Sequence, residues 1–267
     1  MTIGFKSYKV PILDWISDAG SYRDIPMDFD HPLFSDELVN LDNYPIQTRS
    51  YYYVDDGTNE PYGQKIEGSL KSVYCRKQVA ENLLRVNSLL STLELELLVL
   101  DGYRTPQTQQ GLWDFFATKM KNKFNRKNVN REVYAEVIKY VSDPNSFDEN
   151  NYKTWPTHST GGAVDVTVQS IVTKTPLKMG SHFDEMTEQS HTDYFERKLQ
   201  RREIQEDNEF LSNRRLLHWA MSACGFINYP LEYWHYDWGT QMYNYHQSKL
   251  LGTAPNAAWY GYISLRT

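Results

Sequence analysis

Cysteine is scarce in this sequence, since the 267 residues contain only Cys75 and Cys224. Two cysteines cannot form the framework of bridges that stabilises small secreted domains, and neither stands in a zinc-type spacing. The two are interpreted as buried thiols of a reducing compartment, and a single bridge between them is the alternative. The scarcity excludes a fold built on disulfides and a metal site built on cysteines.

Long apolar runs and basic patches are also missing. No stretch of about 18 apolar residues occurs, so no membrane span is expected. Asp14 and Asp18 interrupt the apolar residues of the N-terminal segment, so a signal peptide is not expected either. The expected location is cytoplasmic, or periplasmic if a leader has been removed. The net charge of −6 predicts no nucleic-acid partner, and the composition leaves the oligomeric state open.

Aromatic residues are plentiful, at 14% of the chain, and 20 of them are tyrosines. A disordered chain would be poor in aromatics, and a chain of this length can bury a large core without staples. We expect one domain over residues 1–267, with an irregular N-terminal extension over 1–37 and a polar insertion over 122–155.

Apolar periodicity gives the order of helices and strands. Steps of three and four residues predict helices over 72–92, 106–121, 131–141 and 209–224. Compact or alternating apolar segments predict strands over 50–54, 94–100, 163–168 and 231–238. Because the two kinds of element do not alternate regularly, the pattern favours an α+β fold over a parallel α/β sheet.

A histidine and an aspartate flank a glycine pair in segment 158–165, whose sequence is HSTGGAVD. In an unbroken strand, His158 and Asp165 would point to opposite faces. The glycine pair permits a turn that lets the two side chains converge. A pattern of this kind on its own is more often a surface accident than a metal site.

A second candidate segment, 232–235, has the sequence EYWH. Two histidines, His158 and His235, with one carboxylate and a position left to water form the usual open catalytic zinc site. A carboxylate outside the metal shell must then move a proton, and Glu232 fits that role. For Glu232 and His235 to reach one metal, Glu232 must lie on the loop that enters the strand or at a bulge.

A third segment, 101–106 with sequence DGYRTP, follows the apolar strand at 94–100. Functional residues concentrate in such loops. The guanidinium of Arg104 could stabilise a developing oxyanion or orient a carboxylate. A structural salt bridge within the turn is the alternative.

Taken together and in this order, the three segments resemble the D-alanyl-D-alanine dipeptidase family, which includes the vancomycin-resistance dipeptidase. That family shares its site with D,D-carboxypeptidases and the hedgehog signalling domain. Segment 158–165, Glu232, Trp234, His235 and Arg104 match its motifs. Segment 179–184, with sequence MGSHFD, and segment 213–217 also resemble it. The likeness covers about residues 38–238.

The resemblance implies one domain with a central antiparallel sheet covered by helices, and one zinc ion per chain on His158, Asp165 and His235. Glu232 and Arg104 would be catalytic, and the substrate would be a free D,D-dipeptide that is hydrolysed to D-alanine. Asp184 matches the aspartate that binds the substrate ammonium, although a helix N-cap is the alternative.

The sequence also departs from the family pattern. Pro156 stands at the position of the family's serine, so Thr157 is our candidate for the substrate hydrogen bond of that hydroxyl. Two other functions use the same site. One is a D,D-carboxypeptidase or endopeptidase that acts on peptidoglycan peptides, and the other is a non-catalytic zinc-binding module.

Overall fold

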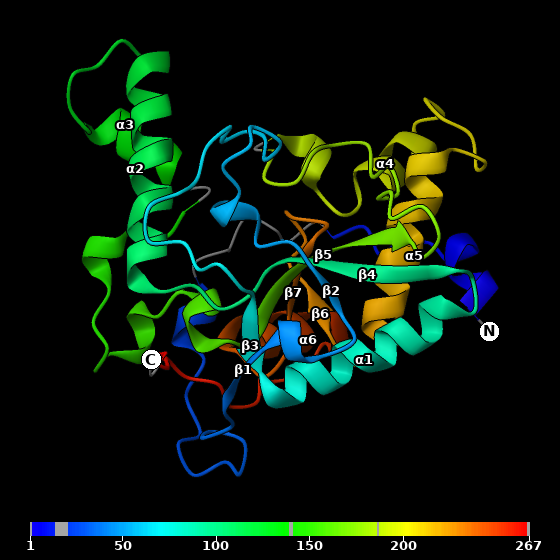
Figure 1. Cartoon of the computed structure of the whole chain (residues 1–267), viewed down its shortest axis with the longest axis horizontal. Helices are drawn as coiled ribbons and strands as arrows, with labels where there is room; N and C mark the ends of the chain where they lie inside the picture. The colour runs from blue at the N-terminus through cyan, green and yellow to red at the C-terminus, as the bar shows by residue number, and fades with distance from the viewer. Residues whose placement is uncertain (1, 14–20, 139–140, 186, 266–267) are drawn as a thin grey trace.

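The computed structural model describes residues 2–13, 21–138, 141–185 and 187–265 (Figure 1). The α-helices of this part are α1 (Lys77–Ser91), α2 (Pro106–Lys123), α3 (Arg131–Val137), α4 (Tyr194–Gln200), α5 (Glu209–Ala223) and α6 (Gln241–Leu251). The strands are β1 (Leu38–Asn40), β2 (Gln47–Thr48), β3 (Tyr74–Arg76), β4 (Leu95–Asp101), β5 (Ala163–Ser170), β6 (Ile227–Asn228) and β7 (His235–Asp237). Short 3-10 helices join them, including η1 (Thr2–Ser7), η3 (Ser21–Asp24), η5 (Tyr51–Tyr53), η7 (Tyr152–Thr154) and η8 (Thr157–Thr160).

A five-stranded sheet in the order β2-β4-β5-β7-β6 forms the centre of the molecule. Strands β4, β5, β7 and β6 pair antiparallel, and the two-residue β2 joins β4 in parallel. Both faces of β5 are buried. Val166 points to one face and Asp165 to the other, and both side chains are fully buried. The predicted α+β fold with a central sheet is confirmed, and the parallel β2–β4 pair departs from the expected antiparallel order.

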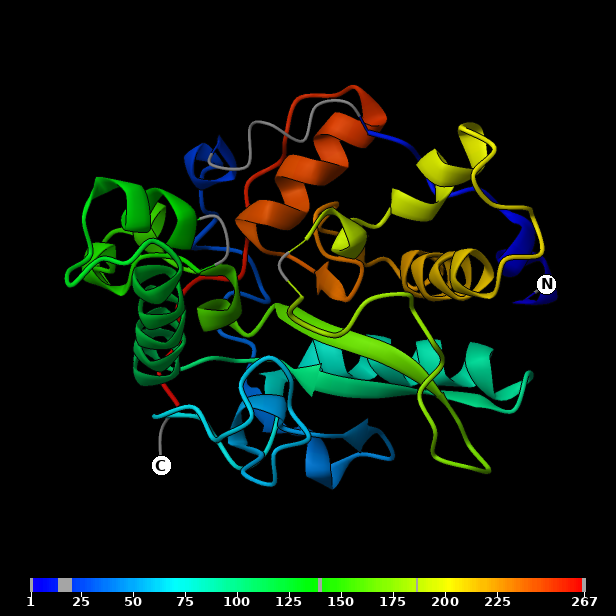
Figure 2. The same cartoon turned by 90° about the horizontal axis from the view of Figure 1, so that it is seen from above.

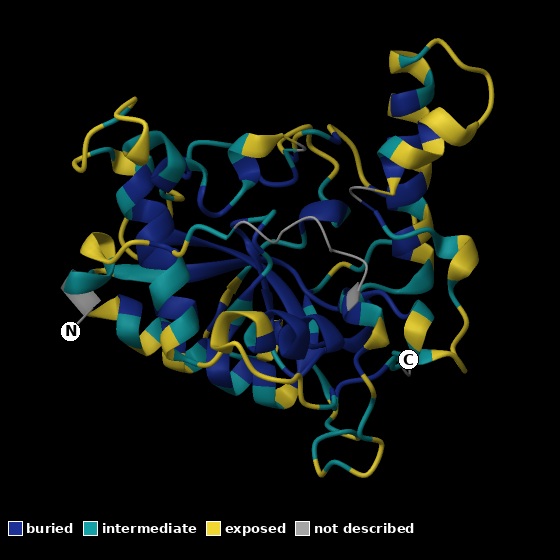
Figure 3. Cartoon of the chain, turned by 180° about the vertical axis from the view of Figure 1, so that it is seen from behind, coloured by how far each residue is buried: buried dark blue, intermediate teal, exposed yellow. Residues whose placement is uncertain are grey.

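Helices lie at both ends of this sheet. Figure 1 shows α2 and α3 projecting at one end, and α4 and α5 gathered at the other. Helix α1 packs against both β4 and α5. Its predicted apolar stripe is fully buried, at Val79, Leu83, Val86 and Leu90. Figure 3 shows the strands as buried and the far tip of the α2–α3 pair as exposed.

Four predicted elements differ in the structure. The helix expected over 131–141 ends at Val137, and residues 139–140 lie outside the described ranges. Residues 50–54 were expected as a strand but form η5, because the pairing of β2 with β4 ends at Thr48 and the chain then turns inward. The helix expected from residue 72 starts at Lys77, because the residues before it pair with β1 as strand β3. The strand expected over 231–238 shrinks to β7, because a turn at Glu232 precedes it.

The N-terminal extension packs against the rest of the chain. Trp219 of α5 donates its ring N–H to the carbonyl of Tyr8 at 2.8 Å, and the backbone N–H of Val10 binds Glu196 at 2.9 Å. Further along, Gln241 of α6 donates to the carbonyls of Arg23 and Ile25 at 3.1 and 2.7 Å. A small second core joins the extension to the C-terminal part and consists of Tyr22, Ile25, Met242, Tyr245 and Ala258. In Figure 2 the blue N-terminal segments accordingly lie beside the orange and red C-terminal ones.

The polar insertion contributes to the core as well as to the surface. Val133 and Val137 of α3 are fully buried against the main core, while Val129 and Tyr134 are exposed. Both cysteines are free, so the alternative of a single bridge is not seen. Within the described ranges, no helix has the length and apolarity that a membrane span requires.

Candidate functional site

Two neighbouring strands and a tight turn bring the three predicted ligands together. Asp165 on β5 and His235 on β7 are directly opposite one another in the antiparallel ladder. His158 lies in η8, and Gly161 then reverses the chain at a φ of +72°. This left-handed conformation favours glycine, and a Cβ added at Gly161 would displace the tip of the Leu38 side chain, 2.6 Å away. The predicted glycine turn is present.

The ligand atoms converge at distances that suit a metal ion. Nε2 of His158 lies 3.1 Å from Nδ1 of His235 and 3.5 Å from Oδ2 of Asp165. Oδ1 of Asp165 lies 3.2 Å from Nδ1 of His235. The ligands of a tetrahedral zinc ion, each bound at about 2.0–2.1 Å, are about 3.3 Å apart. All three residues are buried, and they form a candidate metal site among the described residues.

The outer ring nitrogens determine which atoms face the centre. Nδ1 of His158 donates to the carbonyl of Gly102 at 2.7 Å, and Nε2 of His235 donates to Oδ2 of Asp237 at 2.8 Å. These partners assign the ring protons to the outer nitrogens, so two lone pairs and a carboxylate face one another. Such a donor set repels itself unless a cation lies between the atoms, so the residues fit zinc.

The electrostatics of the cluster show the same demand for positive charge. Burial on its own would lower the pKa of His235, but the carboxylates of Asp237 and Asp165 raise it well above its ordinary value. Burial would likewise raise the pKa of Asp165, yet the imidazoles of His158 and His235 hold it far below its usual range. A proton on His235 fills the role that a metal ion fills in a loaded site.

Glu232 lies at the turn that enters β7, as its predicted role requires. Its Oε2 is 3.7 Å from Nδ1 of His235, and its side chain is 24% exposed. The backbone is fixed on both sides, since the N–H of Glu232 binds the carbonyl of Tyr229 and its own carbonyl accepts from the N–H of His235. Burial raises the pKa of Glu232 to about 8, and the nearby carboxylate of Asp165 adds to this shift. A cation at the site would lower it again and favour the ionised base.

Arg104 contacts a metal ligand instead of standing free. Its Nη2 donates to Oδ2 of Asp165 at 2.9 Å and to the hydroxyl of Tyr52 at 3.0 Å. Its Nε binds Oδ2 of Asp101 at 2.5 Å. The side chain is 13% exposed and lines the cavity described below, so it both orients Asp165 and faces the site. The salt bridge within the turn, expected as an alternative, coexists with these contacts.

Asp184 is held by two tyrosines from the loop after β2. The hydroxyls of Tyr52 and Tyr62 donate to its Oδ2 at 2.7 and 2.8 Å. Burial raises the pKa of Asp184 to about 6, although Arg104 and the two hydroxyls oppose the shift. The residue adopts a φ of 55° in a turn and caps no helix. It is therefore placed as a buried acid beside the metal cluster.

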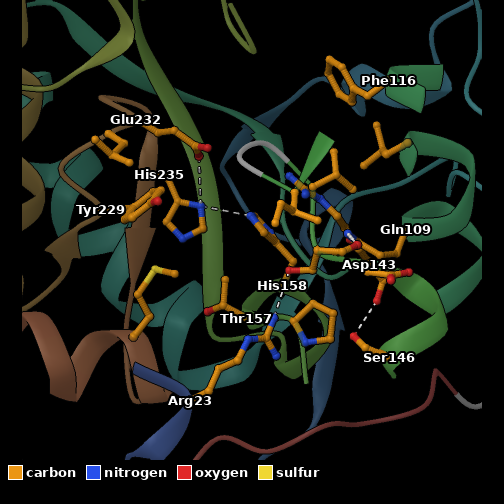
Figure 4. A pocket seen from close by; sticks show the side chains of 18 of the residues that line it. Arg23, Gln109, Phe116, Asp143, Ser146, Thr157, His158, Tyr229, Glu232 and His235 are labelled. Atoms are coloured by element: carbon orange, nitrogen blue, oxygen red, sulfur yellow. Dashed lines mark hydrogen bonds and ion pairs between the residues drawn. The ribbon is translucent and has the colours of Figure 1, made fainter. Parts of the chain in front are cut away.

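A cavity of about 760 Å³ connects these groups (Figure 4). The side chains of Arg104, Thr157, His158, Asp184, Glu232 and His235 line one part of it. Its remaining wall includes Arg23 of the N-terminal extension, Leu112 and Phe116 of α2, Val141 and Lys153 of the polar insertion, and Met242 of α6. Cavities of about 300–1,000 Å³ hold drug-sized ligands, so this one exceeds the needs of a dipeptide.

The profile of the family described as D-ala-D-ala dipeptidase matches residues 46–251. The chain belongs to this family. The D-alanyl-D-alanine dipeptidase of Enterococcus faecium is 30% identical over 209 residues, which cover 76% of this chain and 89% of that protein. The enzyme of the same name from Synechocystis sp. is 27% identical over 176 residues, covering 63% and 69%. Among solved structures, the vancomycin-resistance D,D-pentapeptidase VanY in complex with Zn(II) is similar with a TM-score of 0.41 and 16% identity, over 73% of this chain and 88% of that one.

Membership of the D-ala-D-ala dipeptidase family confirms the predicted peptidase class. The structure gathers all seven predicted site residues, namely Arg104, Thr157, His158, Asp165, Asp184, Glu232 and His235. Thr157 is the one whose contacts differ from expectation. Its hydroxyl donates to Oδ1 of Asp237, so its proton is directed at the carboxylate behind His235. Its role towards substrate stays a prediction.

Sequence reasoning missed several residues of this family member's site. Asp237 positions His235, and it could have been found as the acid two residues further along the same strand face. Tyr52 and Tyr62 hold Asp184, and nothing in a predicted strand over 50–54 pointed to them. The carboxylate of Asp101 forms a salt bridge with Arg104 and lies 3.4 Å from Nδ1 of His158. The sequence indicated Asp101 only as a member of segment 101–106 and gave it no role of its own.

Proposed function

We propose that this protein hydrolyses the dipeptide D-Ala-D-Ala to two molecules of D-alanine in a zinc-dependent reaction. The observation that carries the proposal is the convergence of His158, Asp165 and His235 with Glu232 in one cavity. When bound to these three residues, zinc supplies a Lewis acid and lowers the pKa of a water towards about 7.

Glu232 is the proton carrier of the proposed reaction. Its carboxylate accepts a proton from the attacking water as the new C–O bond forms. The same oxygen then delivers that proton to the departing amine as the C–N bond breaks, so one water is consumed per peptide bond. Its position on a fixed turn next to His235 keeps the carboxylate within reach of both partners.

The other residues orient the substrate and its charge. Arg104 faces the cavity with a permanent positive charge and stabilises the oxyanion that develops on the peptide carbonyl. Asp184, ionised above its raised pKa of about 6, binds the substrate ammonium at neutral pH. The hydroxyls of Tyr52 and Tyr62 keep that carboxylate in one orientation.

The size of the cavity supports a second candidate, hydrolysis of a longer peptidoglycan peptide at its D,D-bond. A volume of about 760 Å³ leaves space beside a bound dipeptide. The two candidates differ at the substrate amine, which is free in a dipeptide and acylated in a longer peptide. A buried acid such as Asp184 favours the free amine.

Release of D-alanine from D-Ala-D-Ala and from its N-acetyl derivative tests both candidates. We expect release from the free dipeptide alone, loss of activity with a chelator, and recovery with added zinc. Preference for the N-acetyl derivative would replace the first candidate with the second. A zinc-loaded protein that cleaves neither peptide would contradict both.

A further inference from the structure

A dipeptide carries a carboxylate as well as an ammonium, and the residues above account only for the ammonium. Binding the carboxylate in a cavity calls for a cation or several N–H donors. Within the described part of the chain, three cationic side chains line the cavity, namely Arg23, Arg104 and Lys153.

Two of these three cations are already paired. Arg104 is bonded to Asp101 at 2.5 Å and to Asp165 at 2.9 Å. Lys153 is bonded to Asp24 at 2.9 Å on the outer surface. Arg104, held against Asp165, is assigned to the oxyanion, and the charge of Lys153 is offset by Asp24, so neither is left for the carboxylate.

Arg23 is bonded only to neutral acceptors. Its Nη1 donates to the carbonyls of Lys153 and Trp155 at 3.2 and 3.4 Å, and its Nη2 donates to the hydroxyl of Ser142 at 3.1 Å. No ion pair of Arg23 occurs among the residues that the structure describes. These bonds fix the guanidinium in place, while its charge stays uncompensated and some of its five N–H donors remain for a ligand.

Two residues that line the cavity with Arg23 are poor donors to a carboxylate. Pro156 has no N–H, and the hydroxyl proton of Thr157 is directed at Asp237. Figure 4 shows Arg23 at the end of the cavity opposite Glu232, with His158 and Thr157 between them. The lining of the cavity therefore includes an anionic group, Asp184, and a cationic group without an acidic partner among the described residues, Arg23.

We propose that Arg23 binds the C-terminal carboxylate of the substrate. The inference rests on the proposed function and names a residue that determines its specificity. Arg23 lies in the N-terminal extension, outside the residues 46–251 that match the family profile. A planar guanidinium suits a carboxylate because it can form two parallel hydrogen bonds.

The test compares D-Ala-D-Ala with its C-terminal amide, using the zinc-loaded protein and its Arg23→Gln variant. We expect the wild type to prefer the acid over the amide in kcat/KM by about 10- to 100-fold, as for hydrogen bonds to a charged group. Arg23→Gln should lose most of this preference because its kcat/KM for the acid falls. Its kcat/KM for the amide should stay within a few-fold of the wild-type value.

Two further variants make the result specific. Lys153→Gln removes a positive charge from the same cavity wall without removing the anchor, so it should keep the preference. Arg23→Lys keeps the positive charge but lacks the planar guanidinium, so it should retain part of the preference for the acid. An equal loss on acid and amide in Arg23→Gln would assign Arg23 a purely structural role and overturn the inference. A wild type that hydrolyses both peptides equally would overturn it while leaving the proposed function standing, and hydrolysis of neither would contradict the proposed function itself.

Discussion

Replacing Asp237 with asparagine should impair zinc binding through the proton of His235. Oδ1 of Asp237 accepts from the hydroxyls of Thr157 and Thr240, so the asparagine carbonyl must take that position. The amide NH₂ then replaces Oδ2 and donates to Nε2 of His235, 2.8 Å away in the wild type. The ring proton is displaced to Nδ1, the atom that faces the metal.

The expected magnitude follows from the role of such outer partners. Their loss costs about 10- to 100-fold in metal affinity, or about 1.4–2.8 kcal/mol. We expect Asp237→Asn to reach the upper end of this range, because it imposes the wrong tautomer. Asp237→Ala should lose less, since the ring can keep its outer proton. Zinc affinity is measured by competition with a chromophoric chelator on the folded metal-free proteins.

Asp143→Asn is the matched control, because it removes a carboxylate that lines the same cavity but binds Asn145 and Tyr134 instead of the cluster. It should bind zinc as the wild type does. If Asp237→Asn also bound zinc within two-fold of the wild type, or bound it more tightly than Asp237→Ala, the tautomer argument would be refuted.

The remaining predictions concern three further polar residues of the site, Glu232, Arg104 and Asp184. Glu232→Gln should bind one zinc per chain by elemental analysis yet lose about 10²- to 10⁴-fold in kcat, and near-normal turnover would assign the base elsewhere. Arg104→Ala should lower kcat at least as clearly as it raises KM in steady-state kinetics, since the guanidinium also orients Asp165; a change in KM alone would make its role uniform substrate binding. The pKa of Asp184 is raised to about 6 in the fold, so its carboxyl stabilises the protein below about pH 4, and that contribution is lost as the pH rises through 6. In denaturant unfolding, the free energy of unfolding of the wild type should therefore fall by about 3 kcal/mol between pH 4 and 6.5, and that of Asp184→Asn should lack this decrease. Parallel pH profiles of the two proteins would contradict the raised pKa.

The parts of the fold that could be predicted from the sequence are those whose burial is periodic. The stripe from Val79 to Leu90 predicted α1, and the apolar segment at 94–100 predicted β4, because one-sided or two-sided burial leaves a visible pattern. The tyrosines at 51–53 have high strand propensity, but only tertiary contact decides that Tyr52 turns inward to Asp184. Propensity without a neighbouring strand was a poor guide there.

The candidate site residues could be predicted from motifs, but the residues that hold them in place could not. His158, Asp165 and His235 could be found because glycine freedom and strand alternation predict where those side chains point. Partners such as Tyr62 and Gly102 come from remote segments with no spacing rule that links them to the ligands. The cytoplasmic location and the limits of the extension and the insertion stay predictions from the sequence.

The joining of the two chain ends in one small core sets a limit for protein engineering. Met242 and Tyr245 of α6 are covered by Tyr22, Ile25 and Ala258, which all lie outside the family match at 46–251. A fragment trimmed to that match, or a chimera that grafts it onto a compact relative, would uncover apolar side chains next to the cavity and open its wall. The smallest transferable unit therefore extends from η3 to beyond Ala258, and a boundary drawn by likeness alone would cut through it.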